Sequence, residues 1–206
     1  MLVKICGITT LEDALAAIEF GADALGFNFY RKSPRFIDPL RAKKIILEMP
    51  PSILKIGVFV NEAEQTVRDL SIDLELDYLQ FHGMETPQYC EQFGRPCWKA
   101  FRLKDEKTLE LMKKYKCDYY LVDAFVENVF GGTGVVADWD LARAAKKVGK
   151  VILAGGLTPE NVGAAVSAVR PEGVDVASGV ELHHGKKDFA KLERFISNAK
   201  DADRSL

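Results

Sequence analysis

Short apolar runs alternate with amphipathic stretches along the whole chain. In the first amphipathic stretch, Leu11, Ala14 and Ile18 recur at the spacing of one helix face. The apolar runs predict strands at 2–6, 24–29, 54–60, 77–81, 97–101, 119–123, 151–154 and 174–177. The other stretches predict helices at 10–20, 39–48, 62–71, 86–93, 105–115, 138–148, 158–169 and 188–200. This alternation is typical of an α/β protein with a parallel sheet.

The repeated strand-helix unit allows two closures of the sheet, an open doubly wound sheet or a (β/α)8 barrel. The number of units favours the barrel, and the length of 206 residues lies near its lower limit of about 200 residues. The G-x-G-x-x-G fingerprint of an open dinucleotide-binding sheet does not follow the first strand. No Ser/Gly/Pro-rich linker interrupts the pattern, so we predict a single (β/α)8 TIM barrel over residues 1–206.

Composition narrows the classes of partner. The chain carries 28 Lys and Arg against 30 Asp and Glu, and this balance predicts no nucleic-acid partner. No apolar run approaches the ~20 residues of a membrane span, and no signal-peptide pattern opens the chain. We therefore expect a cytoplasmic protein with no membrane partner. The four cysteines form no C-x-x-C pair and have no histidine at a zinc-like offset, so we expect free thiols and no metal site.

Several reactive side chains fall at the ends of the predicted strands, where barrel enzymes place their chemistry. Cys6 ends the first strand and shares a face with Lys4, because side chains alternate along a strand. The Lys4 cation could favour the thiolate, or it could pair with a core carboxylate such as Asp175. Alternatively, Cys6 is a small buried apolar residue.

Three other residues have a functional and a plain interpretation. Asp123 ends an apolar strand, where an unpaired carboxylate costs several kcal/mol, so it should have a partner or a task. His82 shares a face with Gln80, and it either binds substrate or is a hydrogen-bonded histidine of the barrel rim. Arg35 lies in a loop and either grips a carboxylate with two hydrogen bonds or is a solvated charge.

Glycine-containing turns follow the last strands of the predicted barrel. A phosphate needs several backbone N–H groups at close range, and glycine removes the side chain that would obstruct it. Gly155 and Gly156 precede one predicted helix, and Ser178 and Gly179 precede a short one, which matches the usual phosphate site of a barrel. Gly132 could add a donor from the loop after the sixth strand. The alternative is that these glycines only form turns.

The ordered set of motifs resembles the phosphoribosylanthranilate isomerase family of tryptophan biosynthesis. Together with Asp123 and Asp175, the matching motifs cover essentially the whole chain. They are Lys4-Ile5-Cys6-Gly7-Ile8-Thr9, Gly26-Phe27-Asn28-Phe29-Tyr30, Lys32-Ser33-Pro34-Arg35, Gln80-Phe81-His82-Gly83, Gly131-Gly132-Thr133-Gly134, Leu153-Ala154-Gly155-Gly156-Leu157 and Ser178-Gly179-Val180-Glu181.

The resemblance implies a cofactor-free Amadori rearrangement of a small phosphorylated aminosugar on a (β/α)8 barrel. It implies Cys6 as general base and Asp123 as general acid. It further implies that Arg35 binds the anthranilate carboxylate, and that His82 and Asp175 line the pocket. The phosphate would bind at Gly132, Gly155, Gly156, Ser178 and Gly179. The resemblance fixes no oligomeric state.

Two departures and three alternatives accompany the resemblance. Ala177 stands where the family often has serine, and Ala124 follows Asp123 where a small polar residue is expected.

A related histidine-pathway aminoaldose isomerase would have aspartate in place of Cys6. A metal-dependent sugar-phosphate epimerase would need more than the three histidines present. A barrel retained as a binding module would not need both Cys6 and Asp123.

Overall fold

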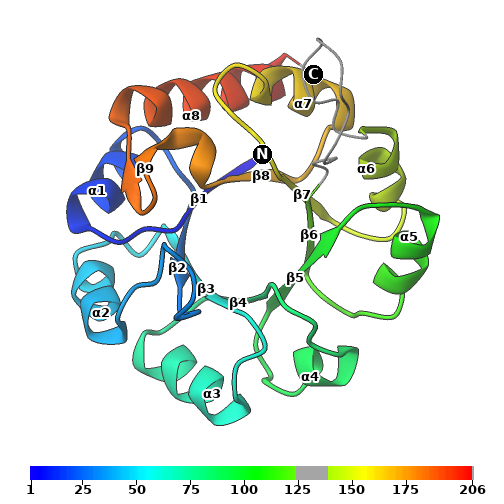
Figure 1. Ribbon diagram of the computed structural model, residues 1–206. Helices are drawn as coiled ribbons and strands as arrows, with labels where there is room; N and C mark the ends of the chain where they lie inside the picture. The colour runs from blue at the N-terminus through cyan, green and yellow to red at the C-terminus, as the bar shows by residue number, and fades with distance from the viewer. Residues whose placement is uncertain (124–138, 206) are drawn as a thin grey trace.

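The computed structural model describes residues 1–123 and 139–205 and confirms the predicted barrel. Eight parallel strands pair in sequence order and close into a ring, with the helices outside it (Figure 1). The strands are β1 (Leu2–Cys6), β2 (Ala24–Asn28), β3 (Leu54–Phe59), β4 (Tyr78–Phe81), β5 (Cys97–Arg102), β6 (Tyr119–Asp123), β7 (Val151–Ala154) and β8 (Gly173–Val176). The helices are α1 (Leu11–Glu19), α2 (Pro39–Leu47), α3 (Glu64–Asp73), α4 (Pro87–Glu91), α5 (Glu106–Met112), α6 (Trp139–Ala145), α7 (Val162–Val169) and α8 (Phe189–Arg204).

Local sequence explains where several helices begin. The Thr10 side chain accepts a hydrogen bond from the Asp13 N–H at the start of α1. At α2 the Asp38 carboxylate caps the helix and is followed by proline at the first helical position. Asp105 and Asp188 cap α5 and α8 in the same way. Each cap satisfies a backbone N–H group that would otherwise lack a partner within the helix.

The predicted start of the helix at 158–169 is wrong, because α7 begins at Val162. The Thr158 N–H donates to Asn161 Oδ1 at 2.8 Å, and the Thr158 hydroxyl accepts from the Glu160 N–H at 3.2 Å. These bonds hold residues 158–161 as a turn. Threonine and asparagine side chains compete for backbone groups in this way, and here that competition outweighs the proline signal.

A small hairpin between β8 and α8 was not predicted. After the 3-10 helix η1 (Ser178–Val180), β9 (Glu181–His183) pairs antiparallel with β10 (Lys186–Lys187). Both strands are too short and too polar to give a period-two pattern. In Figure 1 the hairpin lies beside β1 and α1, and Lys186 of β10 forms ion pairs with Glu12 and Asp13 of α1.

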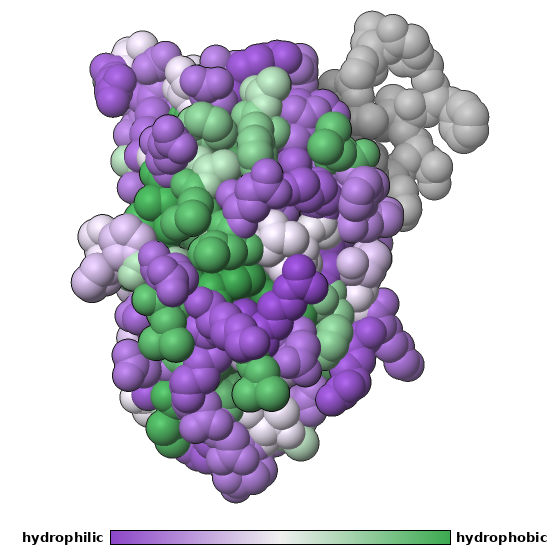
Figure 2. Space-filling view, turned by 90° about the vertical axis from the view of Figure 1, so that its left-hand side faces the viewer, coloured by the Kyte–Doolittle hydropathy of each residue, from purple (hydrophilic) through white to green (hydrophobic). Residues whose placement is uncertain are grey.

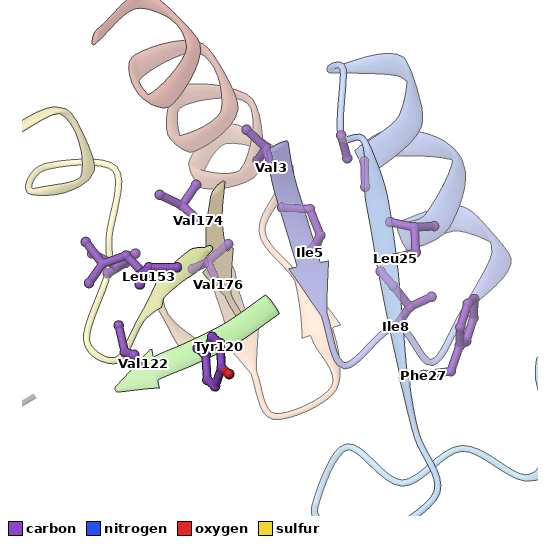
Figure 3. Packing of buried hydrophobic residues seen from close by; sticks show 14 of the residues in the cluster. Val3, Ile5, Ile8, Leu25, Phe27, Tyr120, Val122, Leu153, Val174 and Val176 are labelled. Atoms are coloured by element: carbon purple, nitrogen blue, oxygen red, sulfur yellow. The ribbon is translucent and has the colours of Figure 1, made fainter. Parts of the chain in front are cut away.

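Apolar side chains fill two regions. The larger cluster lies between the strands and the helices, and includes Val3, Ile5, Leu25 and Val174, all fully buried (Figure 3). Burying each such side chain contributes about 1.5–3 kcal/mol. Val3 and Ile5 therefore face the helices, while their neighbour Lys4 faces the barrel interior, as the alternation of side chains along a strand predicts.

A second, smaller cluster fills the interior of the barrel. It consists of the buried residues Ala24, Ile56, Trp98, Leu121, Ile152 and Ala154. The face of the molecule in Figure 2 is mostly hydrophilic, with apolar residues exposed in between. Among the helices of the described residues, none combines the length and apolar content that a membrane crossing requires.

Candidate active site

A cavity of about 460 Å³ opens at the carboxyl ends of the strands. Most of the residues that the sequence proposed for the site line its wall. They are Arg35, His82, Asp123, Gly155, Gly156, Asp175, Ser178 and Gly179. Gly132 lies outside the described residues. Cys6 is 9% exposed and does not itself line this cavity, but it lies near Asp175 and Arg35, which do.

A second cavity of about 350 Å³ adjoins the first. Both cavities are lined by His82 and Asp123, and the second is completed by Gly83, Ala100, Phe101 and Arg102. The Asp123 carboxylate therefore stands between the two spaces. It faces any molecule that extends across the mouth of the barrel.

The predicted phosphate turns meet at one side of the larger cavity. Gly155 and Gly156 have φ angles of +85° and +61°, a backbone conformation that favours glycine. A Cβ atom at Gly179 would lie 1.9 Å from the Leu157 carbonyl oxygen, so this approach of the two loops requires glycine there. The turns are held close together, with their backbone at the cavity wall.

Cys6 and Lys4 meet inside the barrel, as their shared strand face predicted. The Lys4 side chain is fully buried, and its Nζ lies 2.6 Å from Asp175 Oδ1. The pairing of Lys4 with Asp175 is therefore confirmed. The ammonium also lies near the Cys6 thiol, since a Cβ atom on Gly26 would approach both groups. Of the two alternatives that the sequence left open, the core ion pair is confirmed, and an effect of Lys4 on the thiolate stays a prediction.

Burial is the largest influence on the thiol, and it raises the pKa of Cys6 above its ordinary value. The Lys4 ammonium opposes this, Asp175 reinforces it, and Lys187 opposes it more weakly. Burial alone would lower the pKa of Lys4, but Asp175 and Cys6 outweigh it, so the pKa of Lys4 is raised. The lysine is therefore a permanent cation beside the thiol.

Arg35 is not the solvated loop charge of the plain interpretation. Its Nε and Nη2 donate to the two carboxylate oxygens of Glu181, both at 2.8 Å. The hydrogen bonds to Glu181 raise the pKa of Arg35. Within the described residues, Nη1 has no hydrogen-bond partner. Glu181 therefore fixes the guanidinium at the cavity wall and leaves one nitrogen for a ligand.

His82 is held by Gln80, the neighbour on its strand face. Gln80 Nε2 lies 3.0 Å from His82 Nδ1, so the amide donates to this nitrogen as the side chain is oriented. Burial is the main reason that the pKa of His82 is lowered. The imidazole is therefore neutral at pH 7, and its Nε2 carries the proton that can be donated to a ligand.

Two charged residues near the site escaped the sequence analysis, namely Glu181 and Lys187. Lys187 Nζ lies 2.7 Å from the Cys6 carbonyl oxygen and 3.1 Å from Glu181 Oε1. Burial lowers the pKa of Lys187, although Glu181 partly offsets it. Both residues belong to a polar stretch with no periodic pattern. The signal that was available is the place of Glu181 directly after the Ser178-Gly179-Val180 turn.

Comparison with known proteins agrees with this geometry. The family model for N-(5'-phosphoribosyl)anthranilate (PRA) isomerase matches residues 3–198. The chain is 52% identical over 198 residues to the N-(5'-phosphoribosyl)anthranilate isomerase of Geotalea uraniireducens (strain Rf4), covering 96% of this chain and 98% of the relative. It is 49% identical over 198 residues to the Geobacter sulfurreducens protein of the same name, covering 96% of this chain and 98% of the relative.

Solved structures agree as well. The phosphoribosyl anthranilate isomerase from Thermotoga maritima superposes with a TM-score of 0.90 at 42% identity, covering 98% of this chain and 99% of that one. Another, in complex with reduced 1-(o-carboxyphenylamino)-1-deoxyribulose 5-phosphate, has a TM-score of 0.88 at 41% identity and covers 98% of this chain and 100% of its own. The chain therefore belongs to the N-(5'-phosphoribosyl)anthranilate isomerase family.

Proposed function

We propose that Cys6 and Asp123 are the base and the acid of this family's isomerase step in tryptophan biosynthesis. In that step N-(5-phosphoribosyl)anthranilate becomes 1-(2-carboxyphenylamino)-1-deoxyribulose 5-phosphate, an aldose-to-ketose conversion. The observation that carries the proposal is the arrangement at the barrel mouth. Asp123 from β6, the phosphate turns and Asp175 line one cavity, and Cys6 at the end of β1 lies near Asp175.

The phosphate group would bind to the backbone of the glycine turns after β7 and β8. The N–H groups of Gly155, Gly156 and Gly179 suit an anion, because no side chain obstructs them. Ser178 adds a hydroxyl group at the same wall. This end of the cavity would anchor the sugar, so that its ring extends across the barrel mouth towards Asp123.

Asp123 would protonate the ring oxygen of the ribose, and the ring would open to an imine. Cys6 as thiolate would then take the proton from C2, leaving the electron pair in an enolamine that tautomerises to the ketone. The two groups must act on neighbouring atoms of one sugar, which suits an acid and a base from different strands. Contacts to the base commonly tighten when substrate binds, which fits a Cys6 that lies near the cavity without lining it.

Arg35 would bind the anthranilate carboxylate through Nη1, while Glu181 holds its other nitrogens. The neutral His82 would donate a hydrogen bond from Nε2 into the cavity. Asp175, paired with Lys4, would accept from a sugar hydroxyl. We propose a small phosphorylated aminosugar as the partner and the cytoplasm as the location, since four free cysteines suit a reducing compartment.

No cofactor is assigned to the reaction. Among the described residues, no three His, Cys, Asp or Glu side chains are grouped so as to hold a metal ion. The ligand set that a metal-dependent epimerase requires is therefore not found in the part of the chain that is described.

The test is turnover of N-(5-phosphoribosyl)anthranilate, followed as loss of its fluorescence, beside the histidine-pathway aminoaldose. Cys6→Ser and Asp123→Asn should each lower kcat by about 10²–10⁴-fold, the usual contribution of a general acid or base. Binding of a phosphorylated product analogue should persist in both variants. Near-normal turnover by either variant would remove that residue from its role, and a preference for the histidine-pathway substrate would overturn the assignment of substrate.

A further inference from the structure

We propose that Lys4 is the residue that makes Cys6 reactive, because its buried ammonium holds the thiolate in a space that Gly26 keeps open. Lys4 is a positioning residue in this proposal, since it acts on the substrate only through the sulfur. The relevance to catalysis rests on the proposed role of Cys6 as base.

The geometry begins with the pairing of β1 and β2. Cys6 and Gly26 are partners in the register of these strands. A Cβ atom on Gly26 would lie 3.0 Å from Cys6 Sγ and 3.1 Å from Lys4 Nζ. The sulfur and the ammonium therefore converge on the space that a side chain at residue 26 would fill. Gly26 has no positive φ angle, so its backbone does not require glycine, and the reason for glycine here is this space.

Asp175 on β8 keeps the Lys4 side chain charged. β1 and β8 place Lys4 and Asp175 opposite each other, and their side chains are 2.6 Å apart. A fully buried ammonium without a counter-ion would lose its proton. With Asp175 and Cys6 beside it, the pKa of Lys4 is instead raised. Lys4 therefore remains protonated while the thiol gains and loses its proton.

Four charged groups face the Cys6 side chain in the described residues: Lys4 on the same strand, Asp175 on β8, Lys187 on β10 and Arg35 after β2. Two of them have their main contact elsewhere, and a third carries the wrong charge. Lys187 donates to the Cys6 carbonyl, Arg35 is held by Glu181, and Asp175 disfavours a thiolate. Among these four, Lys4 has the largest influence in favour of the thiolate, and its Nζ lies with the sulfur against Gly26.

The Cys6 thiol needs a cation nearby because it is buried. A thiol without a cation nearby has a pKa of about 8.5, and an apolar environment raises the value and makes the thiol inert. Burial is the largest influence on Cys6, and Lys4 is the largest that opposes it. In the proton transfer, the sulfur takes the proton from C2 and the bonding electrons stay on the sugar. The ammonium keeps its three protons and stabilises the sulfur anion before the transfer.

The test measures the reactivity of Cys6 without substrate. Purified full-length protein is treated with iodoacetamide between pH 6 and pH 10, and alkylation is followed at each cysteine by peptide mass spectrometry. The main variant is the double replacement Lys4→Met with Asp175→Asn, which removes both charges and leaves no unpaired buried carboxylate. Gly26→Ala is the second variant, because its methyl group separates sulfur from ammonium and leaves both charges in place.

In Gly26→Ala the alkylation of Cys6 at pH 7 should fall at least tenfold, since each unit of pKa rise lowers the thiolate fraction tenfold. In the double variant it should also fall, but by less, because Lys4 influences the thiol more strongly than Asp175, whose loss acts in the opposite direction. The midpoint of its pH dependence should move to higher pH. Lys99→Met is the matched control, because it also removes a buried ammonium from an ion pair, here with Glu85, and this ammonium contacts the Phe81 and Gly83 carbonyls rather than Cys6. It should leave Cys6 alkylation unchanged, and Cys90 serves as an internal reference in every sample.

An unchanged or faster alkylation of Cys6 in folded double variant and folded Gly26→Ala would overturn the proposal. An equal loss of Cys6 alkylation in Lys99→Met would also overturn it. The loss would then follow from removing any buried ammonium of the barrel and not from removing Lys4. Failure of the proposed function has a different signature. Cys6→Ser would keep its turnover, while alkylation of Cys6 would still depend on Lys4.

Discussion

The interior of this barrel is divided between an apolar part and an ionised part enclosed by the same strands. The apolar part includes Ile56, Leu121 and Ile152, which need no partner beyond close contact. The ionised part includes Lys4, which is as completely buried but has an anionic partner. Apolar packing loses stability in proportion to the atoms removed, whereas a buried ion pair fails when either partner is removed. Removing one member of the ion pair should therefore cost more stability than trimming a methylene group from the apolar part.

The largest effect should come from breaking the ion pair on one side only. Lys4→Met leaves the Asp175 carboxylate, which is 8% exposed, without its cation. We expect the free energy of unfolding to fall by about 3–5 kcal/mol, and the double variant with Asp175→Asn to recover most of this loss. Urea unfolding measures the free energy of unfolding of the single and the double variant. Additive losses in the double variant would show that the two residues do not form an energetic pair.

Gly179→Ala should affect binding of the phosphate group. Its Cβ would collide with the Leu157 carbonyl, so the turns after β7 and β8 must separate. Losing hydrogen bonds to a charged group costs about 1.5–3 kcal/mol, which corresponds to a roughly ten- to hundredfold increase in KM. Steady-state kinetics measures it. The control is Gly163→Ala on α7, where the nearest atom lies at 3.8 Å and KM should not change.

Glu181 should make stability depend on pH at the acid end. Burial alone would raise its pKa, but the hydrogen bonds from Arg35 and Lys187 outweigh this, so the pKa is lowered from about 4.5. A carboxylate with a lowered pKa stabilises the fold above its unfolded pKa, and this contribution is lost as the pH falls through the folded value. Glu181→Gln should be about 2 kcal/mol less stable than the unmodified protein at pH 7.

The difference in unfolding free energy between the unmodified protein and Glu181→Gln should shrink as the pH falls below about 4.5. At that pH the unmodified protein begins to lose the stabilisation by the Glu181 charge, which the variant lacks at every pH. Urea unfolding at a series of pH values measures it. A difference that stays constant down to pH 3 would mean that the Glu181 charge does not stabilise the fold.

The sequence predicted most of the fold because barrel strands and helices have strong periodic patterns. The same period predicted that Lys4 and Cys6 share a face, and it placed Asp123 and His82 at strand ends. The partners of these residues depend on the register between strands, which no local pattern carries. Glu181 and Lys187 were missed for this reason, because their burial arises from the packing of a polar hairpin against β1 and Arg35.

Ile152→Val tests the apolar part of the comparison with a small change. The residue is fully buried in the interior cluster, and removing one methylene group should cost about 0.5–1.5 kcal/mol. Turnover should remain normal, because Ile152 lines neither cavity of the site. Urea unfolding and steady-state kinetics measure the two outcomes. A loss of turnover without a matching loss of stability would show that the two parts of the interior are coupled.

The smallest effect should come from an ion pair outside both parts. Arg68 Nε lies 2.8 Å from Glu64 Oε1 one helical turn away, but both side chains are more than a third exposed. Water screens such pairs, and an i,i+4 pair contributes about 0.3–0.5 kcal/mol. Glu64→Gln should therefore lower stability by no more than this, and 1 M salt should remove the difference because it screens exposed charges. Lys4→Met should remain strongly destabilised in the same salt. If salt rescued the buried pair as well, the contrast between an enclosed, ionised interior and a screened surface would be wrong.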